Sequence, residues 1–367
     1  MTFRYRYLLS LLCLSIGCAL PAGAESELPA IFKTSFEVGG QFYDYQNYHN
    51  VPYFHGGLDL CAVSGTEVFT PVTGLVEIND YKITATAEPH RFSYDRRPVR
   101  RGESLNTRYL EVAITTADGT KWMFRHIEPS SIPVEVFRCM ENKTSLASGS
   151  FIGKVARWLQ PVLPEKRLYD HVHLEILDAD GSYLNPARFV RTSKDYYPPV
   201  LHNLYAARHG SNEAFLLKNS NDNTLSGNID LIAAVTDRMN RAAYQHAIYA
   251  AFWSLERLHQ DGTTSPVEQN EVFRFDTLPF KGERVQLSPI IYRDSISTSS
   301  GKIQANGNSG PRFFLVNLTS GSVSGGYSAD HCLKTSSYPS GRYILNVEIQ
   351  DFSGNSRKQS FKINIKN

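Results

Sequence analysis

Two histidines stand one residue apart in the stretch YDHVHLEILD, at positions 171 and 173. The run HVHLEIL favours a β-strand, in which successive side chains point to opposite faces. His171 and His173 would then share one face, and Val172 would point to the other. Two imidazoles on one face can bind a metal ion or exchange protons. The spacing alone does not separate these roles from two polar residues that share a face.

A second candidate lies upstream in YFHGGLDL, where His55 and Asp59 are four residues apart. Gly56 and Gly57 between them let the backbone fold closely. Taken alone, this pattern also fits a turn whose aspartate accepts backbone hydrogen bonds. With His173, however, the two residues make a set of two imidazoles and one carboxylate. A catalytic zinc site uses three such ligands and keeps a fourth position open for water, so the set predicts hydrolysis with Zn²⁺.

His126 is a third candidate, because it ends the predicted strand KWMFRHI next to the turn at EPSS. A half-buried histidine with satisfied hydrogen bonds would fit the same position. Glu175 shares the predicted strand face of His171 and His173, where it could accept a hydrogen bond from an imidazole or face solvent. The other histidines have no partner at ligand spacing, and we expect surface or structural roles for them: His49, His90, His202, His209, His246, His259 and His331.

Several short motifs follow one another in a fixed order along about residues 50 to 190: HGGLD, GTEVFTPVTGLVE, FRHIEPSSI, SGSFIGKV, HVHLEI and GSYLNPARF. The series is more specific than any one motif, and it resembles the lysostaphin-type, or LytM-like, zinc metallopeptidases. The resemblance implies that His55, Asp59 and His173 bind Zn²⁺. It also implies that His126 and His171 flank the metal-bound water as general base and electrostatic partner. Which of the two has which role is not given by the sequence.

The resemblance further implies an exported zinc metalloendopeptidase that cuts peptide bonds in peptidoglycan stem peptides or cross-links. Insertions at 79–108, 132–148 and 156–170 border the substrate cleft in the family, so the choice of substrate stays open. One alternative is a non-catalytic LytM-like module that binds and activates another wall hydrolase, although such modules have usually lost ligands. Another alternative is a zinc peptidase that acts on extracellular proteins.

The first residues, MTFRYRYLLSLLCLSIGCALPAGAES, combine two arginines with a short apolar run and the small residues AGA. This arrangement predicts a secretory signal peptide over residues 1–24 and a secreted or periplasmic protein. Lipidation at Cys18 is an alternative, although Ser15 stands where a lipobox usually has leucine. No later segment is apolar enough to cross a membrane. Without Arg4 and Arg6, basic and acidic residues are equal in number, so we expect no nucleic acid as partner.

Three cysteines follow the predicted signal peptide. Export into an oxidising compartment favours one disulfide and one free thiol. We expect Cys61 to pair with Cys139, because both lie in the first half of the chain, and Cys332 to be free.

The length of 367 residues favours two domains. Residues 25–194 contain short runs rich in Val, Ile, Tyr and Phe with almost no helical periodicity, which predicts an antiparallel all-β domain; the resemblance implies the LytM-like fold for it. The segment KDYYPPV indicates a linker. Residues 195–367 again predict strands, and the hairpin around DFSGNS resembles the end of immunoglobulin-like modules. We expect a β-sandwich there, without chemistry, that binds a wall component or a protein.

Overall fold

The computed structural model describes residues 30–48, 51–86, 91–158, 169–192, 194–218, 223–239, 244–278, 281–305 and 313–367. The predicted signal peptide and Cys18 lie outside these ranges. Strands dominate the described residues, and the α-helices among them are the short α1 (Val134–Asn142) and α2 (Lys281–Ile291). The all-β class predicted from the sequence is therefore confirmed. Within the described ranges, no helix is long and apolar enough to span a membrane.

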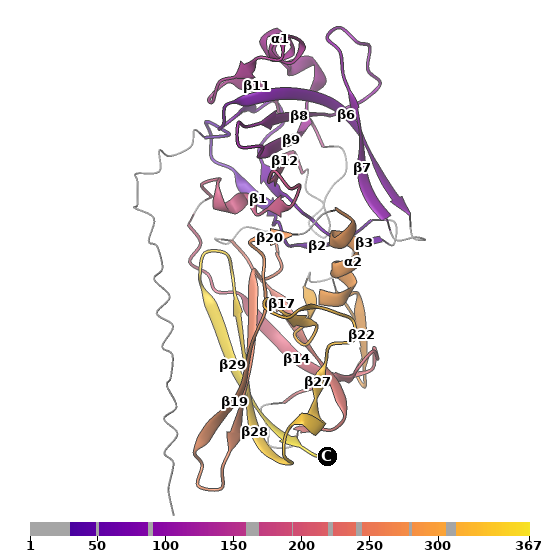
Figure 1. Cartoon of the computed structure of the whole chain (residues 1–367), viewed down its shortest axis with the longest axis vertical. Coiled ribbons are helices and arrows are strands. Elements are labelled where there is room, and N and C mark those ends of the chain that lie inside the picture. Colours follow the sequence, from indigo (N-terminus) through magenta and orange to yellow (C-terminus); the bar gives the residue numbers. More distant parts are fainter. Residues whose placement is uncertain are drawn as a thin grey trace, which may run out of the picture.

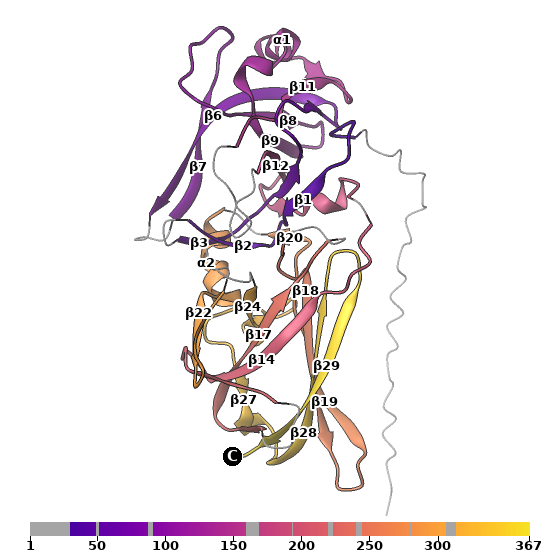
Figure 2. The same ribbon diagram turned by 180° about the vertical axis from the view of Figure 1, so that it is seen from behind.

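The chain forms two β-rich halves that are stacked along the long axis of the molecule (Figures 1 and 2). The first half runs from β1 to β13, and the second begins with β14, after the KDYYPPV segment. Strand β20 (Thr277–Leu278) and helix α2 belong to the second half in sequence but lie where the halves meet. Strand β20 pairs with β13 and so extends the sheet of the first half.

The main sheet of the first half has the strand order β1-β4-β12-β9-β8-β6-β10, with β7 beside β6 and β13 beside β12. Its neighbouring strands are antiparallel, and the strands expected at KWMFRHI and HVHLEIL are β9 and β12. The strands of this sheet are β1 (Glu37–Gly40), β4 (Leu58–Cys61), β6 (Gly74–Thr86), β7 (Arg91–Pro98), β8 (Leu110–Thr115), β9 (Lys121–Ile127), β10 (Ser145–Leu146), β12 (His171–Leu177) and β13 (Tyr183–Leu184). Smaller pairs join β2 (Tyr45–Tyr48) to β3 (Val51–Phe54) and β5 (Glu67–Phe69) to β11 (Phe151–Lys154).

Strand β12 shows the alternation that its sequence predicts. Val172, Leu174 and Ile176 are fully buried in the apolar core of the first half. The alternate residues His171 and His173 therefore point to the opposite face of the sheet. Burial of the apolar face sets the register of the strand, because a slip of one residue would turn the histidines into the core.

Strand β9 departs from this alternation near its end. Its pairing with β8 shifts between Leu110 and Val112, so Arg125 and His126 together lie opposite Glu111. His126 has a φ of 66°, in the left-handed region that residues other than glycine rarely adopt. Such a bulge adds one residue to a strand and re-aims a side chain. Here it turns His126 towards the histidines of β12, whereas unbroken alternation would turn it into the core.

The second half consists of two layers of sheet. One layer has the order β15-β14-β17-β24-β21, with β27 beside β17, and the other has the order β16-β29-β28-β18-β19. The strands of the first layer are β14 (Val200–Arg208), β15 (Ala214–Leu216), β17 (Asn228–Thr236), β21 (Tyr292–Arg293), β24 (Phe314–Asn317) and β27 (Leu333–Lys334). The strands of the second are β16 (Asn223–Leu225), β18 (Ala250–Leu258), β19 (Thr264–Arg274), β28 (Gly341–Gln350) and β29 (Ser356–Ile365). Strand β16 runs parallel to β29.

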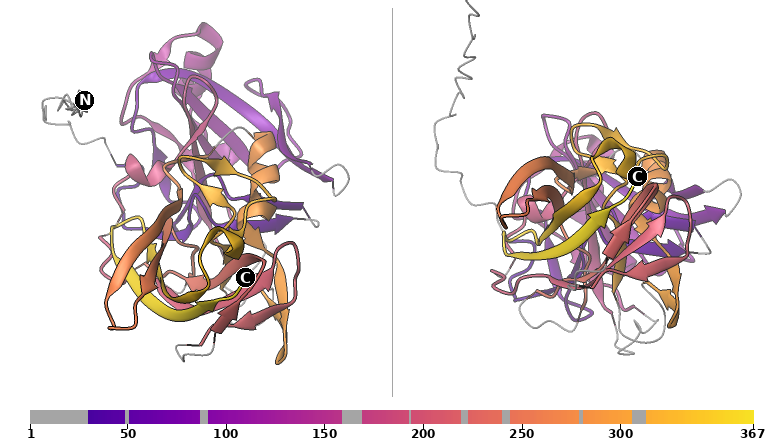
Figure 3. Two further views of the ribbon diagram at one scale, coloured as in Figure 1. Left: turned by 60° about the horizontal axis from the view of Figure 1, so that its bottom comes forward. Right: turned by 90° about the horizontal axis from the view of Figure 1, so that it is seen from below.

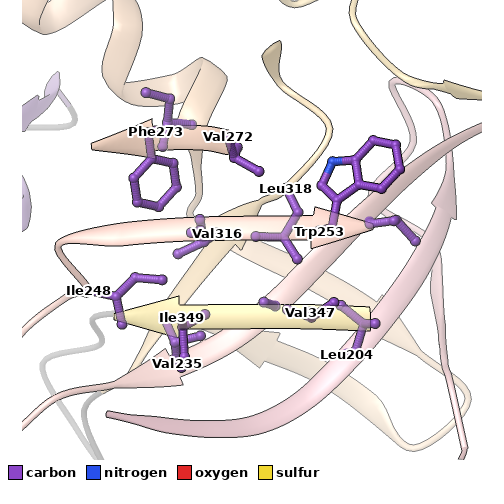
Figure 4. Packing of buried hydrophobic residues seen from close by; sticks show 14 of the residues in the cluster. Leu204, Val235, Ile248, Trp253, Val272, Phe273, Val316, Leu318, Val347 and Ile349 are labelled. Atoms are coloured by element: carbon purple, nitrogen blue, oxygen red, sulfur yellow. The ribbon is translucent and has the colours of Figure 1, made fainter. Parts of the chain in front are cut away.

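Apolar side chains from both layers form one core. Figure 4 shows Leu204, Val235 and Val316 from one layer facing Trp253 and Val347 from the other. Seen from its lower end, the molecule presents these layers in front of the first half (Figure 3). Two hairpins complete the described strands: β22 (Ser295–Thr298) with β23 (Gly301–Gln304), and β25 (Gly321–Ser322) with β26 (Gly326–Tyr327).

The core of the second half continues into the first half. Phe42, Tyr43 and Phe54 come from the first half and are fully buried in the same cluster as the side chains of the two layers. The ring of Tyr43 stacks on that of Phe275, with centroids 5.6 Å apart. The two halves are therefore joined by shared apolar packing as well as by the strand pair β13–β20.

The expected disulfide between Cys61 and Cys139 is wrong. Both cysteines, like Cys332, are free thiols in the structure. Cys61 ends β4, whereas Cys139 lies on α1, which packs beside β6. Strands β4 and β6 are four positions apart in the sheet, about 19 Å at the usual strand spacing, and a disulfide needs Cα atoms within about 7 Å.

Candidate metal centre

Three of the residues singled out from the sequence lie together as a buried cluster. The ligand atoms of His55, Asp59 and His173 are within 4.8 Å of one another. Asp59 on β4 pairs directly with His173 on β12, and His55 lies just before β4. Nε2 of His55 is 3.1 Å and Nδ1 of His173 is 2.8 Å from the same oxygen, Oδ1 of Asp59. Two imidazoles thus converge on one carboxylate.

The outer nitrogens of both imidazoles have acceptors. Nδ1 of His55 donates to the carbonyl of Gln41 at 3.0 Å, and Nε2 of His173 lies 3.1 Å from Oε1 of Glu175. Because a carbonyl and a carboxylate only accept hydrogen bonds, each of these nitrogens can keep the ring proton when the inner nitrogen, which faces Asp59, binds a metal ion. The inner nitrogens can then act as ligands, an arrangement typical of metal-binding histidines. Glu175 is fully buried, so of the two alternatives left open by the sequence, the contact with an imidazole is the one found and the solvent-facing position is not.

The backbone passes very close to this cluster at two glycines. A Cβ atom on Gly40 would lie 2.8 Å from Oδ2 of Asp59, and one on Gly57 would lie 2.7 Å from Nε2 of His173. Gly56 has a φ of 75°, as the close fold expected between His55 and Asp59 requires. Glycine is therefore needed at these positions to leave room for the side chains.

Asp59 is held as an ionised carboxylate. Burial raises its pKa, but the neighbouring imidazoles, that of His55 first, outweigh burial and lower the pKa well below its usual value. The hydroxyl of Tyr169 donates to Oδ2 at 2.8 Å. Two imidazole nitrogens and an ionised carboxylate oxygen form a donor set that suits Zn²⁺ better than Ca²⁺ or Mg²⁺, which prefer oxygen ligands.

His171 and His126 lie beside the cluster. Nε2 of His171 is 3.6 Å from Oδ1 of Asp59, and its Nδ1 donates to the carbonyl of Tyr169 at 2.6 Å. The rings of His126 and His171 meet edge to face, with centroids 4.6 Å apart. Burial lowers the pKa of both histidines, so their rings are neutral near pH 7. All five residues predicted from the sequence are therefore brought together.

Tyr81 is a residue of this site that the sequence did not indicate. It lies on β6, within the 79–108 insertion, and its hydroxyl is 2.6 Å from Nδ1 of His126. The ring of Trp158 also contacts His126, with centroids 4.9 Å apart. Tyr81 and His126 are 45 residues apart, so no local pattern connects them; they meet because β6 and β9 flank β8 in the sheet.

A buried charge network lies behind His173. The guanidinium of Arg125, fully buried, donates from Nη2 to Oε2 of Glu175 at 2.7 Å and from Nε to Oε2 of Glu111 at 2.8 Å. It also lies 3.8 Å from the ring centroid of Tyr94. Burial raises the pKa of Glu111, but the charges of Arg125 and of Arg96, 2.8 Å away, outweigh burial and lower it. Arginines and glutamates balance one another's charge in this network.

A second group of buried acids lies near the junction of the halves. Carboxylate oxygens of Asp195, Asp237 and Asp351 are within 4.8 Å of one another. Burial, followed by the charges of Asp351 and Asp195, raises the pKa of Asp237 to about 8. Both oxygens of Asp351 accept hydrogen bonds from Asn355. This group lacks nitrogen donors, and we assign it no ligand.

A cavity in the second half lies beside Asp237 and away from the histidine cluster of the first half. It has a volume of about 750 Å³ and includes Tyr197, His202, Asp237 and Phe313 in its lining. None of the five site residues of the first half lines it. The cavity is therefore separate from the histidine cluster.

No protein-family model matches this chain, and no curated protein matches it. The resemblance to LytM-like peptidases consequently rests on the ordered motifs.

Proposed function

We propose that the protein is an exported zinc metalloendopeptidase that hydrolyses peptide bonds in peptidoglycan stem peptides or cross-links. The observation that carries the proposal is the convergence of His55 and His173 on Asp59, with His126 and His171 beside them. When bound there, a zinc ion supplies a Lewis acid and lowers the pKa of a water molecule to about 7. His55, Asp59 and His173 would hold the ion, and three protein ligands are the number typical of catalytic rather than structural zinc sites.

His171 is suited to accept a proton. Its Nδ1 donates to the carbonyl of Tyr169, so the neutral ring carries its proton on that side. Nε2 is then the basic nitrogen, and it faces Asp59 at 3.6 Å. A general base must lie within reach of the proton it removes, and a water molecule held beside Asp59 would lie near this nitrogen. We assign His171 the role of general base.

His126 is suited to donate a hydrogen bond. Among the described residues, the hydroxyl of Tyr81 has His126 Nδ1 as its hydrogen-bond partner. Burial raises the pKa of Tyr81 well above its usual value, so the hydroxyl keeps its proton, and we assign it as the donor in its hydrogen bond to Nδ1. Nε2 of His126 then carries the ring proton and can stabilise a developing oxyanion. The two histidines thus differ in role because their Nδ1 atoms have partners of opposite kind.

Peptidoglycan as the substrate is supported by the ordered motifs that resemble LytM-like peptidases. The same resemblance supports a LytM-like fold for residues 25–194, and the two layers of sheet support an immunoglobulin-like sandwich for residues 195–367. We propose that the sandwich binds a wall component or a protein partner. The non-catalytic alternative is disfavoured, because this chain retains three candidate ligands and both flanking histidines in one buried site.

The test uses purified full-length protein and sacculi of defined cross-link type. Mass spectrometry of the released muropeptides should show loss of cross-linked species with wild-type protein and none with His171→Ala. Wild-type protein should carry about one zinc per chain. If zinc is bound but the amount of cross-linked species does not change, the wall-peptidase proposal is wrong. That result would favour cleavage of extracellular proteins or activation of another hydrolase.

A further inference from the structure

The turn formed by residues 40–44 makes hydrogen bonds to both the side chain and the backbone of His55, the first candidate ligand. The carbonyl of Gln41 accepts the hydrogen bond from Nδ1 of His55 at 3.0 Å. The carbonyl of Asp44 accepts the backbone N–H of His55 at 2.8 Å. The turn therefore fixes both the backbone and the ring orientation of this residue.

The carboxylate of Asp44 links this turn to the second half of the molecule. Oδ2 accepts the backbone N–H of Gln41 at 2.9 Å and so closes the turn. The same oxygen lies 3.0 Å from Nδ1 of His246, and Oδ1 accepts the backbone N–H of Ala247 at 2.7 Å. Asp44 is only 2% exposed and His246 is fully buried. One buried carboxylate thus bonds to the residue that orients His55 and to the second half.

Other contacts fasten the same turn to the second half. The hydroxyl of Tyr292 donates to the carbonyl of Tyr43 at 3.0 Å, and Nε2 of Gln41 lies 2.9 Å from the sulfur of Met239. Phe42 is fully buried in the core of the second half. A shift of the second half would therefore carry the turn with it, and with the turn the acceptor of His55.

We propose that Asp44 is a positioning residue of the metal centre, through which His246 and Ala247 of the second half fix the orientation of His55. This inference rests on the metal site described under Proposed function and extends it. It makes the second half a structural part of the centre. Partners that orient a histidine ligand typically change metal affinity 10- to 100-fold when they are lost, because the free ring must then be ordered on binding.

The experiment measures zinc affinity of the full-length protein by competition with a chromophoric chelator. The variant Asp44→Asn keeps the size of the side chain but replaces one carboxylate oxygen by an NH₂ group. In the wild type the backbone N–H groups of Gln41 and Ala247 donate to the two oxygens, so one of these donors would face another donor in the variant. We expect a loss of zinc affinity of about 10- to 100-fold and an altered visible spectrum of the Co²⁺-substituted protein. His246→Gln changes only the second half and should lower the affinity in the same direction.

Asp230→Asn is the matched control. Asp230 is fully buried near the start of β17, within the second half, and its carboxylate bonds to Nδ1 of His209 at 2.9 Å and Nη2 of Arg293 at 2.8 Å. This substitution should lower the melting temperature, because it also removes a buried charge from its partners, and leave zinc affinity and the Co²⁺ spectrum unchanged.

Wild-type affinity in both Asp44→Asn and His246→Gln would overturn the inference, even if their melting temperatures fall. An equal loss in Asp230→Asn would also overturn it, because the effect would then follow from stability alone. If Asp44→Asn does not fold, His246→Gln decides. A wild-type chain that binds no zinc would overturn this inference and the proposed function together. Zinc binding without peptidase activity would count against the proposed function only.

Discussion

Oε1 of Glu175 lies 3.1 Å from Nε2 of His173, whereas Nδ1 of the same ring faces Asp59. The other oxygen of Glu175 accepts a hydrogen bond from Arg125 at 2.7 Å. Both ring nitrogens thus face carboxylates, and Glu175, whose charge is balanced by a buried arginine, can hold the proton on Nε2 when Nδ1 binds a metal ion. A negatively charged acceptor also makes the opposite nitrogen of the imidazole a stronger ligand.

Replacing Glu175 by glutamine should lower zinc affinity about 10- to 100-fold. The amide is uncharged, so it polarises His173 less, and Arg125 loses one of its two buried carboxylates. Chelator competition measures the affinity. Glu77→Gln is the control, because Glu77 is half exposed and its pair with Lys121 at 2.7 Å is a surface ion pair of small energy. An affinity of Glu175→Gln equal to that of the control would show that Glu175 does not act on the metal site.

The two histidines of HVH should respond differently to alanine substitution. His173→Ala removes a ligand and should lose both zinc and activity. His171→Ala should keep zinc but lose activity by about 10²- to 10⁴-fold, the usual contribution of a general base. Zinc content by elemental analysis and muropeptide release measure the two effects. Equal loss of zinc in both variants would overturn the division of roles between the neighbours.

The variant His126→Gly should have a higher free energy of unfolding than His126→Ala. Its φ of 66° is left-handed, which costs a residue with a Cβ atom about 1 kcal/mol and costs glycine almost nothing. Both variants should be inactive, so denaturant unfolding provides the measurement. Lys143, with a φ of 54° at the end of α1, is a matched position and should show the same order. Greater stability of His126→Ala than of His126→Gly would mean that the bulge of β9 is absent in solution.

The strand pattern of HVHLEIL was sufficient to predict that His171 and His173 share a face, because apolar residues at every second position determine which side is buried. The glycines of HGGLD likewise indicated that His55 and Asp59 approach each other. The position of His126 could not be derived in this way. Alternation alone turns it into the core, and the bulge that reverses its direction depends on the pairing with β8.

Contacts between residues that are far apart in the chain could also not be predicted from the sequence. Tyr81 on β6 contacts His126 on β9 across the intervening strand β8, and Asp44 contacts His246 although they are 202 positions apart in the sequence. The sequence offered His246 as one of several histidines without a partner at ligand spacing. Its partner, Asp44, is brought near by the packing of the two halves. The alternation of apolar and polar residues within a strand carries no information about such packing.

Asp237 should make the protein less stable as pH rises from about 5 to 8. Burial, and then the charges of Asp351 and Asp195, raise its pKa to about 8. The folded state therefore keeps a proton that the unfolded chain releases near pH 4, and the resulting stabilisation is lost as pH rises towards 8. Asp237→Asn resembles the protonated form, so its advantage over wild type in denaturant unfolding should grow over this range, by up to several kcal/mol. Asp180→Asn, at an exposed position, is the control for the loss of a carboxyl group. A pH-independent difference between Asp237→Asn and wild type would mean that the carboxyl group of Asp237 is already ionised in the folded protein at pH 5.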